Sequence, residues 1–112
     1  MENKYFLSIC IPSYNRPKTL KRLLDTIDSK RYREVQIVIC EDLSPARTDI
    51  RATVKDFKKI TKYDVKYVEN EVNCGYDKNL RQLMLNADGE FLIYMGDDDG
   101  FIPGALDVYI CL

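Results

Sequence analysis

Four short apolar runs alternate with amphipathic stretches along this chain. The runs are Tyr5 to Ile11, Val35 to Cys40, Val65 to Val68 and Phe91 to Met95. Such alternation is typical of βα units, and it predicts an α/β, Rossmann-like domain whose mainly parallel sheet carries helices on both faces. The first, second and fourth runs are almost continuously apolar, as in strands covered on both sides. We therefore expect these three strands to lie inside the sheet.

Each amphipathic stretch presents one apolar face at helical spacing. The predicted faces are Leu20, Leu23, Leu24 and Ile27 in the first helix, Ile50, Val54 and Phe57 in the second, and Tyr76, Leu80, Leu83, Met84 and Ala87 in the third. The opposite positions are largely charged. We therefore expect each helix to pack on the sheet along one side.

Residues with cap chemistry mark the ends of these helices. Pro17 suits the first turn of the first helix, because proline lacks an N–H that would have no partner there, and Ser13 or Asn15 is its candidate cap. Residues 48–49, Thr-Asp, can cap and charge the start of the second helix. Gly89 follows the third helix and predicts its stop.

Length and composition indicate one folded domain. The chain has 112 residues, 46% of them hydrophobic and 31% charged, with only 5 Gly and 4 Pro, which are the proportions of a globular protein with a single core. After Pro103-Gly104 an apolar stretch runs to Leu112 without a polar close. We therefore expect residues 1–112 to be one domain that forms the N-terminal part of a longer one.

The charge balance and the absence of histidine exclude several classes of function. Lys plus Arg number 17 against 18 for Asp plus Glu, so no overall basic field would attract nucleic acid or an anionic membrane, and the Lys-rich segment Lys55 to Lys62 fits the solvated face of the second helix. No histidine is present, which excludes Ser-His-Asp and Cys-His nucleophiles and His-containing zinc sites. Any catalysis would depend on carboxylates.

The four cysteines favour a reducing compartment. Cys10, Cys40, Cys74 and Cys111 lie far apart and form no C-x-x-C pair, so we expect free thiols, mostly buried. The N-terminus has no signal-peptide layout, and no apolar stretch approaches the ~20 residues of a membrane span. The expected location is the cytoplasm.

Polar clusters follow three of the predicted strands. They are Pro12-Ser13-Tyr14-Asn15-Arg16, Glu41-Asp42-Leu43-Ser44 and Gly96-Asp97-Asp98-Asp99-Gly100. In open α/β sheets ligands bind beyond the carboxyl ends of the strands. We therefore expect all three clusters to face one crevice.

The acidic triplet is the sharpest candidate for metal chemistry. Three adjacent carboxylates repel one another unless a cation or proton neutralises them. Carboxylate oxygens select Mg²⁺ or Mn²⁺, and one or two of them plus diphosphate oxygens complete an octahedral site. A solvated acidic turn is the alternative, but its position directly after an apolar strand favours the metal site.

Asp42 can select a nucleotide base. A carboxylate only accepts hydrogen bonds, so it favours rings that present an N–H, such as uracil, thymine or guanine, over adenine. Tyr14 can stack on the base or ribose. The alternatives are a turn residue for Asp42 and strand-end packing for Tyr14. Together they predict a pocket for a uridine, thymidine or guanosine nucleotide.

Four motifs in order carry a family resemblance. They are Ser8 to Arg16, Ile37 to Ser44, Asn73-Cys-Gly75 with Lys78-Asn79, and Gly89 to Asp99. This series resembles the nucleotide-binding half of family 2 glycosyltransferases with the GT-A fold, over nearly the whole chain. Gly96 stands where the family's metal motif usually begins with Asp, so the assignment within the triplet is a hypothesis.

The resemblance implies a role for each matching residue. The residues that would hold the nucleotide-sugar are Pro12, Ser13, Tyr14, Asn15, Arg16, Asp42, Asn73, Gly75, Lys78, Asn79 and Asp97. Asp98 would be the main metal ligand with Asp99 beside it, and Lys78 would offset diphosphate charge. The metal would be Mn²⁺ or Mg²⁺.

The resemblance also implies the reaction and its partners. An inverting, metal-dependent transferase would move a sugar from a UDP-, TDP- or GDP-sugar, UDP by preference, to a glycan or lipid-linked acceptor hydroxyl. Its acceptor site and catalytic base would lie in a downstream half, so this part alone would bind donor but hardly turn over. The intact enzyme would lie in the cytoplasm, including a peripheral place at the inner face of the membrane. Half a GT-A sheet should also expose apolar surface near Tyr109 to Leu112 and favour self-association.

Two other functions stay open. A non-catalytic module could use the same crevice to bind a nucleotide or a partner domain. Sugar-phosphate nucleotidyltransferases share related architecture, but the Gly-rich, Arg-containing loop expected after the first strand is missing here.

Overall fold

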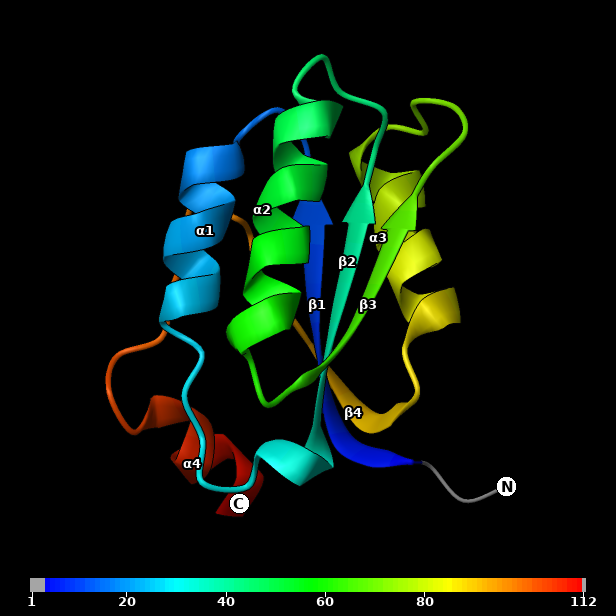
Figure 1. Ribbon diagram of the computed structural model, residues 1–112. Helices are drawn as coiled ribbons and strands as arrows, with labels where there is room; N and C mark the ends of the chain where they lie inside the picture. Colours follow the sequence, from blue (N-terminus) through cyan, green and yellow to red (C-terminus); the bar gives the residue numbers. More distant parts are fainter. Residues whose placement is uncertain (1–3, 112) are drawn as a thin grey trace.

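The computed structural model describes residues 4–111, with side chains up to residue 108, as a parallel α/β fold. Its strands and helices alternate along the chain (Figure 1). The elements are β1 (Tyr5–Ser13), α1 (Pro17–Asp25), the short 3₁₀ helix η1 (Tyr32–Glu34), β2 (Val35–Glu41), α2 (Arg47–Ile60), β3 (Asp64–Glu69), α3 (Tyr76–Asn86), β4 (Gly89–Tyr94) and α4 (Ala105–Cys111). The predicted alternation is confirmed.

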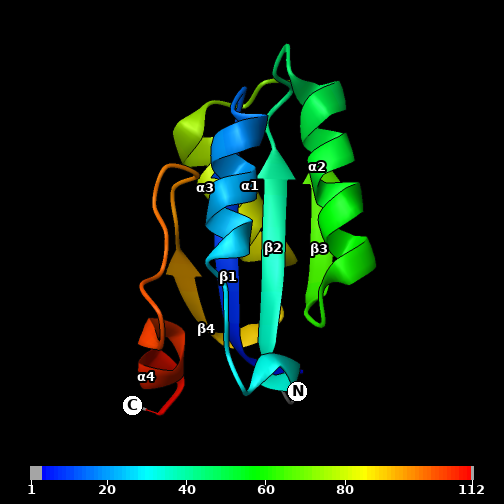
Figure 2. The same ribbon diagram turned by 60° about the vertical axis from the view of Figure 1, so that its left-hand side comes forward.

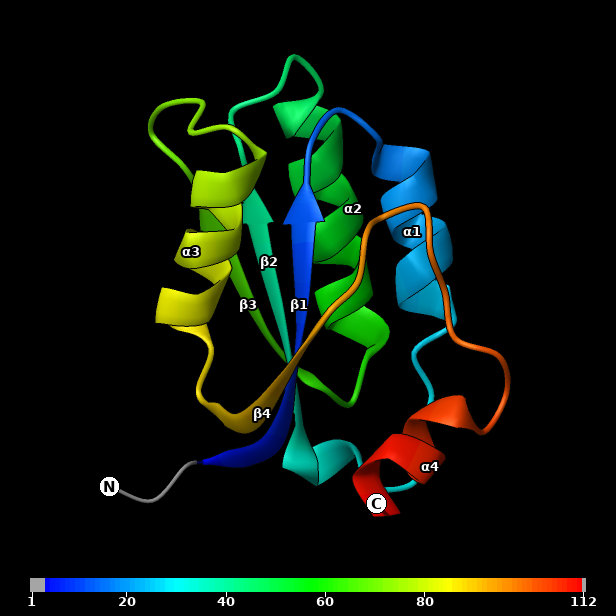
Figure 3. The ribbon, with the colours of Figure 1, turned by 180° about the vertical axis from the view of Figure 1, so that it is seen from behind.

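The strands form one parallel sheet in the order β3-β2-β1-β4. Helices α1 and α2 lie side by side on one face, and α3 covers the other (Figures 1 and 3). This is the α/β, Rossmann-like arrangement expected from the sequence. All carboxyl ends of the strands therefore point to the same edge of the sheet, at the top of Figure 1.

Two apolar cores flank the sheet. The larger core packs α1 and α2 against one side of β1 and β2, and includes Ile9, Ile37, Leu23 and Ile50. The smaller core lies under α3 and is formed by Cys10, Val38, Cys40 and Leu83. Cys10, Cys40 and Cys74 are free thiols, the first two buried and the third half-buried. The buried strands β1 and β2 lead directly to Pro12 to Arg16 and to Asp42.

The fourth apolar run does not lie inside the sheet, so that prediction is wrong. In the described part of the chain β4 pairs with β1 alone and forms an edge. Its Phe91 and Tyr94 are 53% and 45% exposed. Tyr76 and Met84 on α3 are also exposed, whereas the buried residues of that helix are Asn79 and Leu83. Helix α3 packs mainly over β1 and β2, and Leu92 of β4 is only partly buried against the core under this helix.

Several predicted helix ends differ in detail. Pro17 does occupy the first turn of α1, but Arg16 is the cap residue, because β1 continues through Ser13 and Asn15 takes a left-handed turn (φ 61°). Helix α2 begins at Arg47, so residues 48–49 lie inside its first turn. Gly89 starts β4, where an added Cβ would lie 2.6 Å from the Ser8 backbone nitrogen. Glycine at this position therefore allows β4 to lie close to β1.

After β4 the chain returns past α1 to the end of the sheet opposite the carboxyl edge (Figures 1 and 2). Phe101 N–H donates to Thr26 Oγ1 (3.0 Å) on the way. The Asp107 carboxylate of α4 accepts hydrogen bonds from Ser29 Oγ (2.6 Å) and the Lys30 N–H (3.2 Å). Asp107 thus fastens α4 to the loop after α1, far from the carboxyl edge.

The self-association surface expected at Tyr109 to Leu112 lies outside the described side chains. Among the described residues no helix is both long and apolar enough to cross a membrane.

Candidate functional site

A cleft of about 890 Å³ lies at the carboxyl edge of the sheet. The segment after β1, Asp42 after β2 and the acidic triplet after β4 meet there with the loop before α3. The rest of the predicted second cluster, Glu41, Leu43 and Ser44, does not line the cleft. Its lining residues are Pro12, Ser13, Tyr14, Asn15, Arg16, Asp42, Asn73, Gly75, Tyr76, Asn79, Tyr94, Met95, Gly96, Asp97, Asp98 and Asp99. Lys78, exposed on α3, is the one predicted site residue that does not line this cleft.

Backbone hydrogen bonds that continue the sheet beyond its strands hold the cleft loops in place. Asp42 N–H donates to Ser13 O (3.0 Å), Asn70 N–H to Glu41 O (2.9 Å) and Met95 N–H to Cys10 O (3.0 Å). Each bond links the first loop residues after one strand to a neighbouring strand. The polar clusters therefore converge because the parallel ladder brings them side by side.

The segment after β1 supplies an aromatic ring and a cation. Tyr14 lines the cleft and is 47% exposed, so its side chain is accessible to a ligand. Arg16 Nη1 lies 3.8 Å from Asp97 Oδ1 and 4.0 Å from Asp98 Oδ2. Arg16 therefore offsets part of the negative charge of the acidic triplet.

The acidic triplet lies in a tight turn. Asp99 N–H donates to Gly96 O (3.0 Å), which turns the three carboxylates around the Gly96 backbone. A Cβ at position 96 would lie 3.0 Å from Asp98 Oδ1 and 3.2 Å from Asp99 Oδ2. The glycine thus leaves room for two carboxylates to approach one another, where a larger residue would crowd them.

The three carboxylates differ in exposure. The Asp97 side chain is 12% exposed and that of Asp98 is 66% exposed. Burial raises the pKa of Asp97, although the nearby Arg16 charge works in the opposite direction. Asp98 is therefore much more open to an incoming cation than Asp97, and Asp99 is exposed as well.

This donor set fits a divalent cation that is shared with a substrate. Among the residues that the structure describes, no group of three or more acidic or cysteine side chains could hold a metal ion unaided. Mg²⁺ is commonly held by one or two carboxylates together with substrate phosphates. Asp98 and Asp99, both beside Gly96, supply that number of hard oxygen donors.

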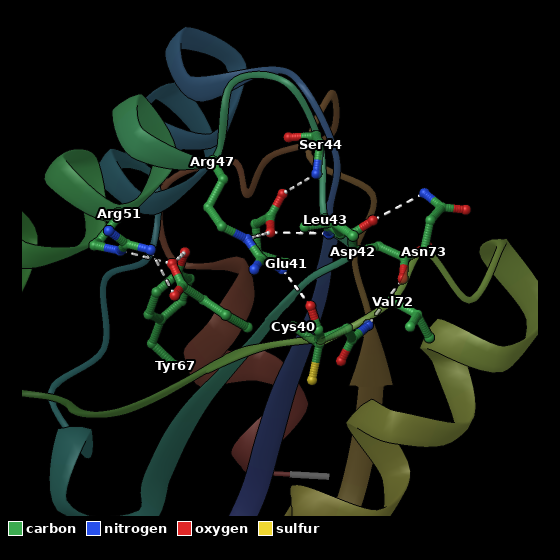
Figure 4. A network of polar contacts seen from close by, with 12 residues as sticks. Cys40, Glu41, Asp42, Leu43, Ser44, Arg47, Arg51, Tyr67, Val72 and Asn73 are labelled. Carbon is green, nitrogen blue, oxygen red and sulfur yellow. Dashed lines mark hydrogen bonds and ion pairs between the residues drawn. The ribbon is translucent and has the colours of Figure 1, made fainter.

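Asp42 has a structural role that the sequence did not reveal. Its Oδ1 accepts hydrogen bonds from Asn70 Nδ2 (2.9 Å) and Cys74 N–H (2.8 Å), and its Oδ2 accepts one from Gly75 N–H (2.9 Å). Asn73 Nδ2 also donates to the Asp42 carbonyl (2.9 Å), as Figure 4 shows. The carboxylate fastens the start of α3 to the end of β2. The three bonds occupy three of the about four acceptor positions of an ionised carboxylate, and Asp42, although only 4% exposed, lines the cleft.

A buried amide pair supports this loop. Asn79, only 3% exposed, donates from Nδ2 to Cys40 O (3.1 Å) and accepts from Asn70 Nδ2 (2.8 Å). Asn79 thus touches the cleft while its amide holds α3 to β2. Asn70 was missed by sequence reasoning, although it directly follows β3 as the other clusters follow their strands.

A buried ion pair lies behind Asp42 and shapes its turn (Figure 4). Glu41 is fully buried, and its carboxylate accepts the Leu43 N–H (2.9 Å), the Ser44 N–H (2.8 Å) and Arg47 Nε–H. Arg47 Nη2 also donates to Asn70 O. Leu43 has a left-handed backbone (φ 55°), which is costly for leucine. Glu41 stabilises that turn by binding both of its N–H groups.

One lining hydroxyl is left over. Ser13 Oγ is buried and has no hydrogen-bond partner among residues 4–111. Buried hydroxyls are usually paired, so a ligand in the cleft is a suitable partner. Tyr76, Tyr94 and Met95 add apolar surface to the lining; the predicted apolar face of α3 had placed Tyr76 in the core.

Comparison with known proteins shows which family the chain is similar to. The family model described as glycosyl transferase family 2 matches residues 8–109. Abequosyltransferase RfbV of Salmonella typhimurium is 26% identical over 94% of this chain and 35% of its own length. A Campylobacter jejuni GalNAc(5)-diNAcBac-PP-undecaprenol beta-1,3-glucosyltransferase is 25% identical over 89% of this chain and 32% of its own length. The chain spans about a third of these relatives.

Solved structures show the same fold. Staphylococcus aureus TarS 1-349 in complex with UDP-GlcNAc superposes with a TM-score of 0.79 at 23% identity, covering 95% of this chain and 30% of that one. The Pyrobaculum calidifontis mannosyltransferase PcManGT in complex with GDP-Man and Mn²⁺ gives 0.80 at 18%, covering 97% and 32%. The fold expected from the resemblance is confirmed, and this chain belongs to glycosyl transferase family 2.

Proposed function

We propose that this chain is the donor-binding part of an inverting glycosyltransferase that takes its sugar from a nucleoside-diphosphate sugar. The observation that carries the proposal is the single cleft in which Tyr14, Asp42 and the acidic triplet meet at the carboxyl edge of the sheet. These groups supply a stacking ring, a hydrogen-bond acceptor and cation ligands within one volume. Family membership supports the same activity.

The base and ribose would lie between Tyr14 and Asp42. Tyr14 would stack on the ring, and the remaining acceptor position of Asp42 would take a ring N–H from uracil, thymine or guanine. Ser13 Oγ, buried and unpaired among residues 4–111, would gain a partner from the nucleotide. We prefer UDP as the nucleotide, because one structure of similar fold, TarS, is in complex with UDP-GlcNAc. Because PcManGT is in complex with GDP-Man, GDP is tested as well.

The diphosphate would lie against the acidic triplet and Arg16. Asp98 and Asp99 would hold Mn²⁺ or Mg²⁺, which stabilises the developing charge on a leaving diphosphate when bound. Asp97 would lie beside them toward the ribose. Arg16, now within 4.0 Å of two of these carboxylates, is placed to contact the diphosphate as well.

The transfer itself is a displacement at the anomeric carbon. The acceptor hydroxyl oxygen forms the new bond there as the bond from that carbon to the diphosphate oxygen breaks, and the nucleoside diphosphate leaves with the electron pair. The hydroxyl proton passes to a carboxylate base. None of the 112 residues is assigned as that base, and the acceptor, a glycan or lipid-linked sugar in polysaccharide biosynthesis, is assigned to no site here.

Isothermal titration with UDP, TDP, GDP and ADP tests the proposal, each with Mn²⁺, Mg²⁺ or chelator. We expect one of the first three to bind with metal, ADP to stay silent, and Asp98→Asn to remove the metal dependence. Asp49→Asn, an exposed carboxylate on α2, is the matched control and should bind as the parent does. Equal binding of all four nucleotides without metal would contradict the proposal, and so would no binding of any of them.

A further inference from the structure

The side chain of Asn70 lies between two residues of the nucleotide cleft. Asn70 directly follows β3 and is buried, and it does not line the cleft itself. Its Nδ2 donates to Asp42 Oδ1 (2.9 Å) and to Asn79 Oδ1 (2.8 Å). Both acceptors belong to residues that do line the cleft. Asn70 can therefore act on a bound nucleotide only through these two residues.

The direction of these hydrogen bonds is fixed at both ends. Asn79 Nδ2 donates to the Cys40 carbonyl (3.1 Å), and a carbonyl oxygen can only accept. The Asn79 amide oxygen therefore points toward Asn70, and the ionised Asp42 carboxylate likewise offers only acceptors. A flipped Asn70 amide would set its own oxygen against both of these acceptors. The network thus holds the Asn70 amide with its NH₂ group toward Asp42.

The backbone of Asn70 is held by elements outside the cleft. Its N–H donates to the last carbonyl of β2 (2.9 Å), and its carbonyl accepts a hydrogen bond from Arg47 of α2. The other donors to the Asp42 carboxylate within the described residues are Cys74 N–H and Gly75 N–H, which belong to the loop before α3. Asp42 itself fastens that loop. Of these three donors, Asn70 is therefore the one whose position is set by the sheet.

Asn70 also determines which acceptor position of Asp42 remains. Oδ1 accepts from Asn70 and Cys74 N–H, whereas Oδ2 accepts from Gly75 N–H alone within residues 4–111. A carboxylate has about two acceptor positions on each oxygen, so the remaining one is on Oδ2. Rotation of the carboxylate about its Cβ–Cγ bond would break the hydrogen bond to Asn70. The acceptor that faces a ligand is therefore held in one direction.

We propose that Asn70 is a positioning residue that makes Asp42 selective for nucleobases with a ring N–H. The inference rests on the proposed function, in which Asp42 accepts that N–H. Uracil and guanine present a ring N–H where cytosine and adenine present a lone pair beside an amine. A fixed carboxylate accepts from the first two bases and meets a lone pair on the others. A carboxylate that is free to turn can accept from the amine instead, so Asn70 would exclude cytosine and adenine by preventing that turn.

Isothermal titration with two matched pairs of nucleotides, UDP with CDP and GDP with ADP, tests this role in the presence of Mn²⁺. Each pair shares its ribose and diphosphate. We expect the parent to bind UDP or GDP at least about 10-fold more tightly than its amine counterpart, the factor that one hydrogen bond to a charged group contributes. Asn70→Ala should lower this ratio to less than about threefold, because the freed carboxylate accepts from either ring.

Asn70→Asp separates hydrogen bonding from the filling of space. It keeps the size of the side chain but replaces the NH₂ donor with an oxygen, so the ratio should fall in this variant as well. If Asn70 only filled space, the ratio would stay at the parent value. The ratio is the readout because partial unfolding weakens both apparent affinities by the same factor.

Gln36→Ala is the matched control. Gln36 is also a buried amide, and its Nε2 donates to Asp88 Oδ2 (2.9 Å), but it lies near the amino end of β2, away from the cleft. Its loss should lower the Tm and leave the ratio within about twofold of the parent, since distant sites act independently. Thermal unfolding would show which variants fold.

Three outcomes would overturn the inference and leave metal-dependent nucleotide binding in place. They are a ratio that stays at the parent value in a folded Asn70 variant, an equal fall of the ratio in Gln36→Ala, and parent protein that binds the two members of each pair equally. Parent protein that binds none of the four nucleotides would contradict the proposed function itself, and this inference with it.

Discussion

Glu41→Gln tests how much the Glu41–Arg47 pair beside the cleft contributes to the free energy of unfolding. Glu41 is fully buried and its two oxygens accept from two backbone N–H groups and Arg47. Glutamine keeps one acceptor oxygen, but its amide NH₂ replaces the other oxygen and would face N–H donors. The substitution also removes the negative charge that pairs with Arg47. Removing one member of a buried ion pair costs about 3–5 kcal/mol. Because the Arg47 side chain is 20% exposed and can reach water, we expect the lower end, about 3 kcal/mol.

Urea and thermal unfolding would measure this cost. A loss of about 3 kcal/mol corresponds to a fall in Tm of roughly 12 °C for a domain of this size. The matched control is Glu34→Gln, which breaks an exposed ion pair. The side chains of this pair, Glu34 and Arg31, are 41% and 46% exposed. That change should cost less than about 1 kcal/mol.

Arg47→Met completes a double-mutant cycle with Glu41→Gln. Arg47→Met alone leaves the Glu41 carboxylate buried without its cation, while the double variant removes both charges. The double variant should therefore lose clearly less free energy of unfolding than the sum of the two single variants, with a coupling of about 2 kcal/mol. The reasoning is refuted if Glu41→Gln behaves like Glu34→Gln, or if the two single losses simply add.

Three further predictions concern the backbone and the thiols. Gly89→Ala should destabilise the fold by about 2 kcal/mol or more, because the new Cβ would lie 2.6 Å from the backbone nitrogen of Ser8; a Tm unchanged in a thermal melt would contradict this contact. Leu43→Gly should raise the free energy of unfolding in urea by about 1 kcal/mol, since the left-handed backbone at φ 55° costs leucine but not glycine and the side chain is 41% exposed; a loss of stability would show that the Leu43 side chain matters more than its backbone. Burial raises the pKa of Cys10 to about 12 and of Cys40 to about 11, so alkylation at pH 8 should spare both thiols until the protein unfolds. Because the unfolded thiols lose their protons first as pH rises, their contribution to stability is complete below about pH 9 and falls between there and the folded pKa values, and a urea midpoint that does not decline over that interval would contradict the assignment.

Local patterns predicted much of the fold because burial leaves a periodic trace in the sequence. The apolar runs correctly marked β1 and β2, and the Leu20 face marked α1, since each buries the residues that its own period places on one side. The run around Phe91 shows the limit of this argument. An apolar run indicates that a strand can be buried. Which elements bury it depends on the path of the rest of the chain.

In the cleft, too, some residues could be predicted from the sequence and others could not. Pro12 to Arg16, Asp42 and the acidic triplet could be proposed from the sequence because they directly follow apolar strands, and strand ends are where ligands bind in such sheets. Asn70 also follows a strand, yet its role depends on hydrogen bonds to Asp42 and Asn79. Lys78 was implied by the family resemblance, but it lies outside the cleft lining.

The sequence by itself thus determined the element types, the parallel sheet and the polar residues at its carboxyl edge, because these follow from local periodicity and from the order of the motifs. Only the tertiary structure decided that Asp42 anchors the start of α3, that Glu41 and Arg47 form an ion pair, and that Lys55, Lys58 and Lys59 line a groove. The physical reason is that hydrogen bonds and charge neutralisation join side chains that are distant in sequence. Which partner each side chain meets is settled only when the helices return the chain to the sheet.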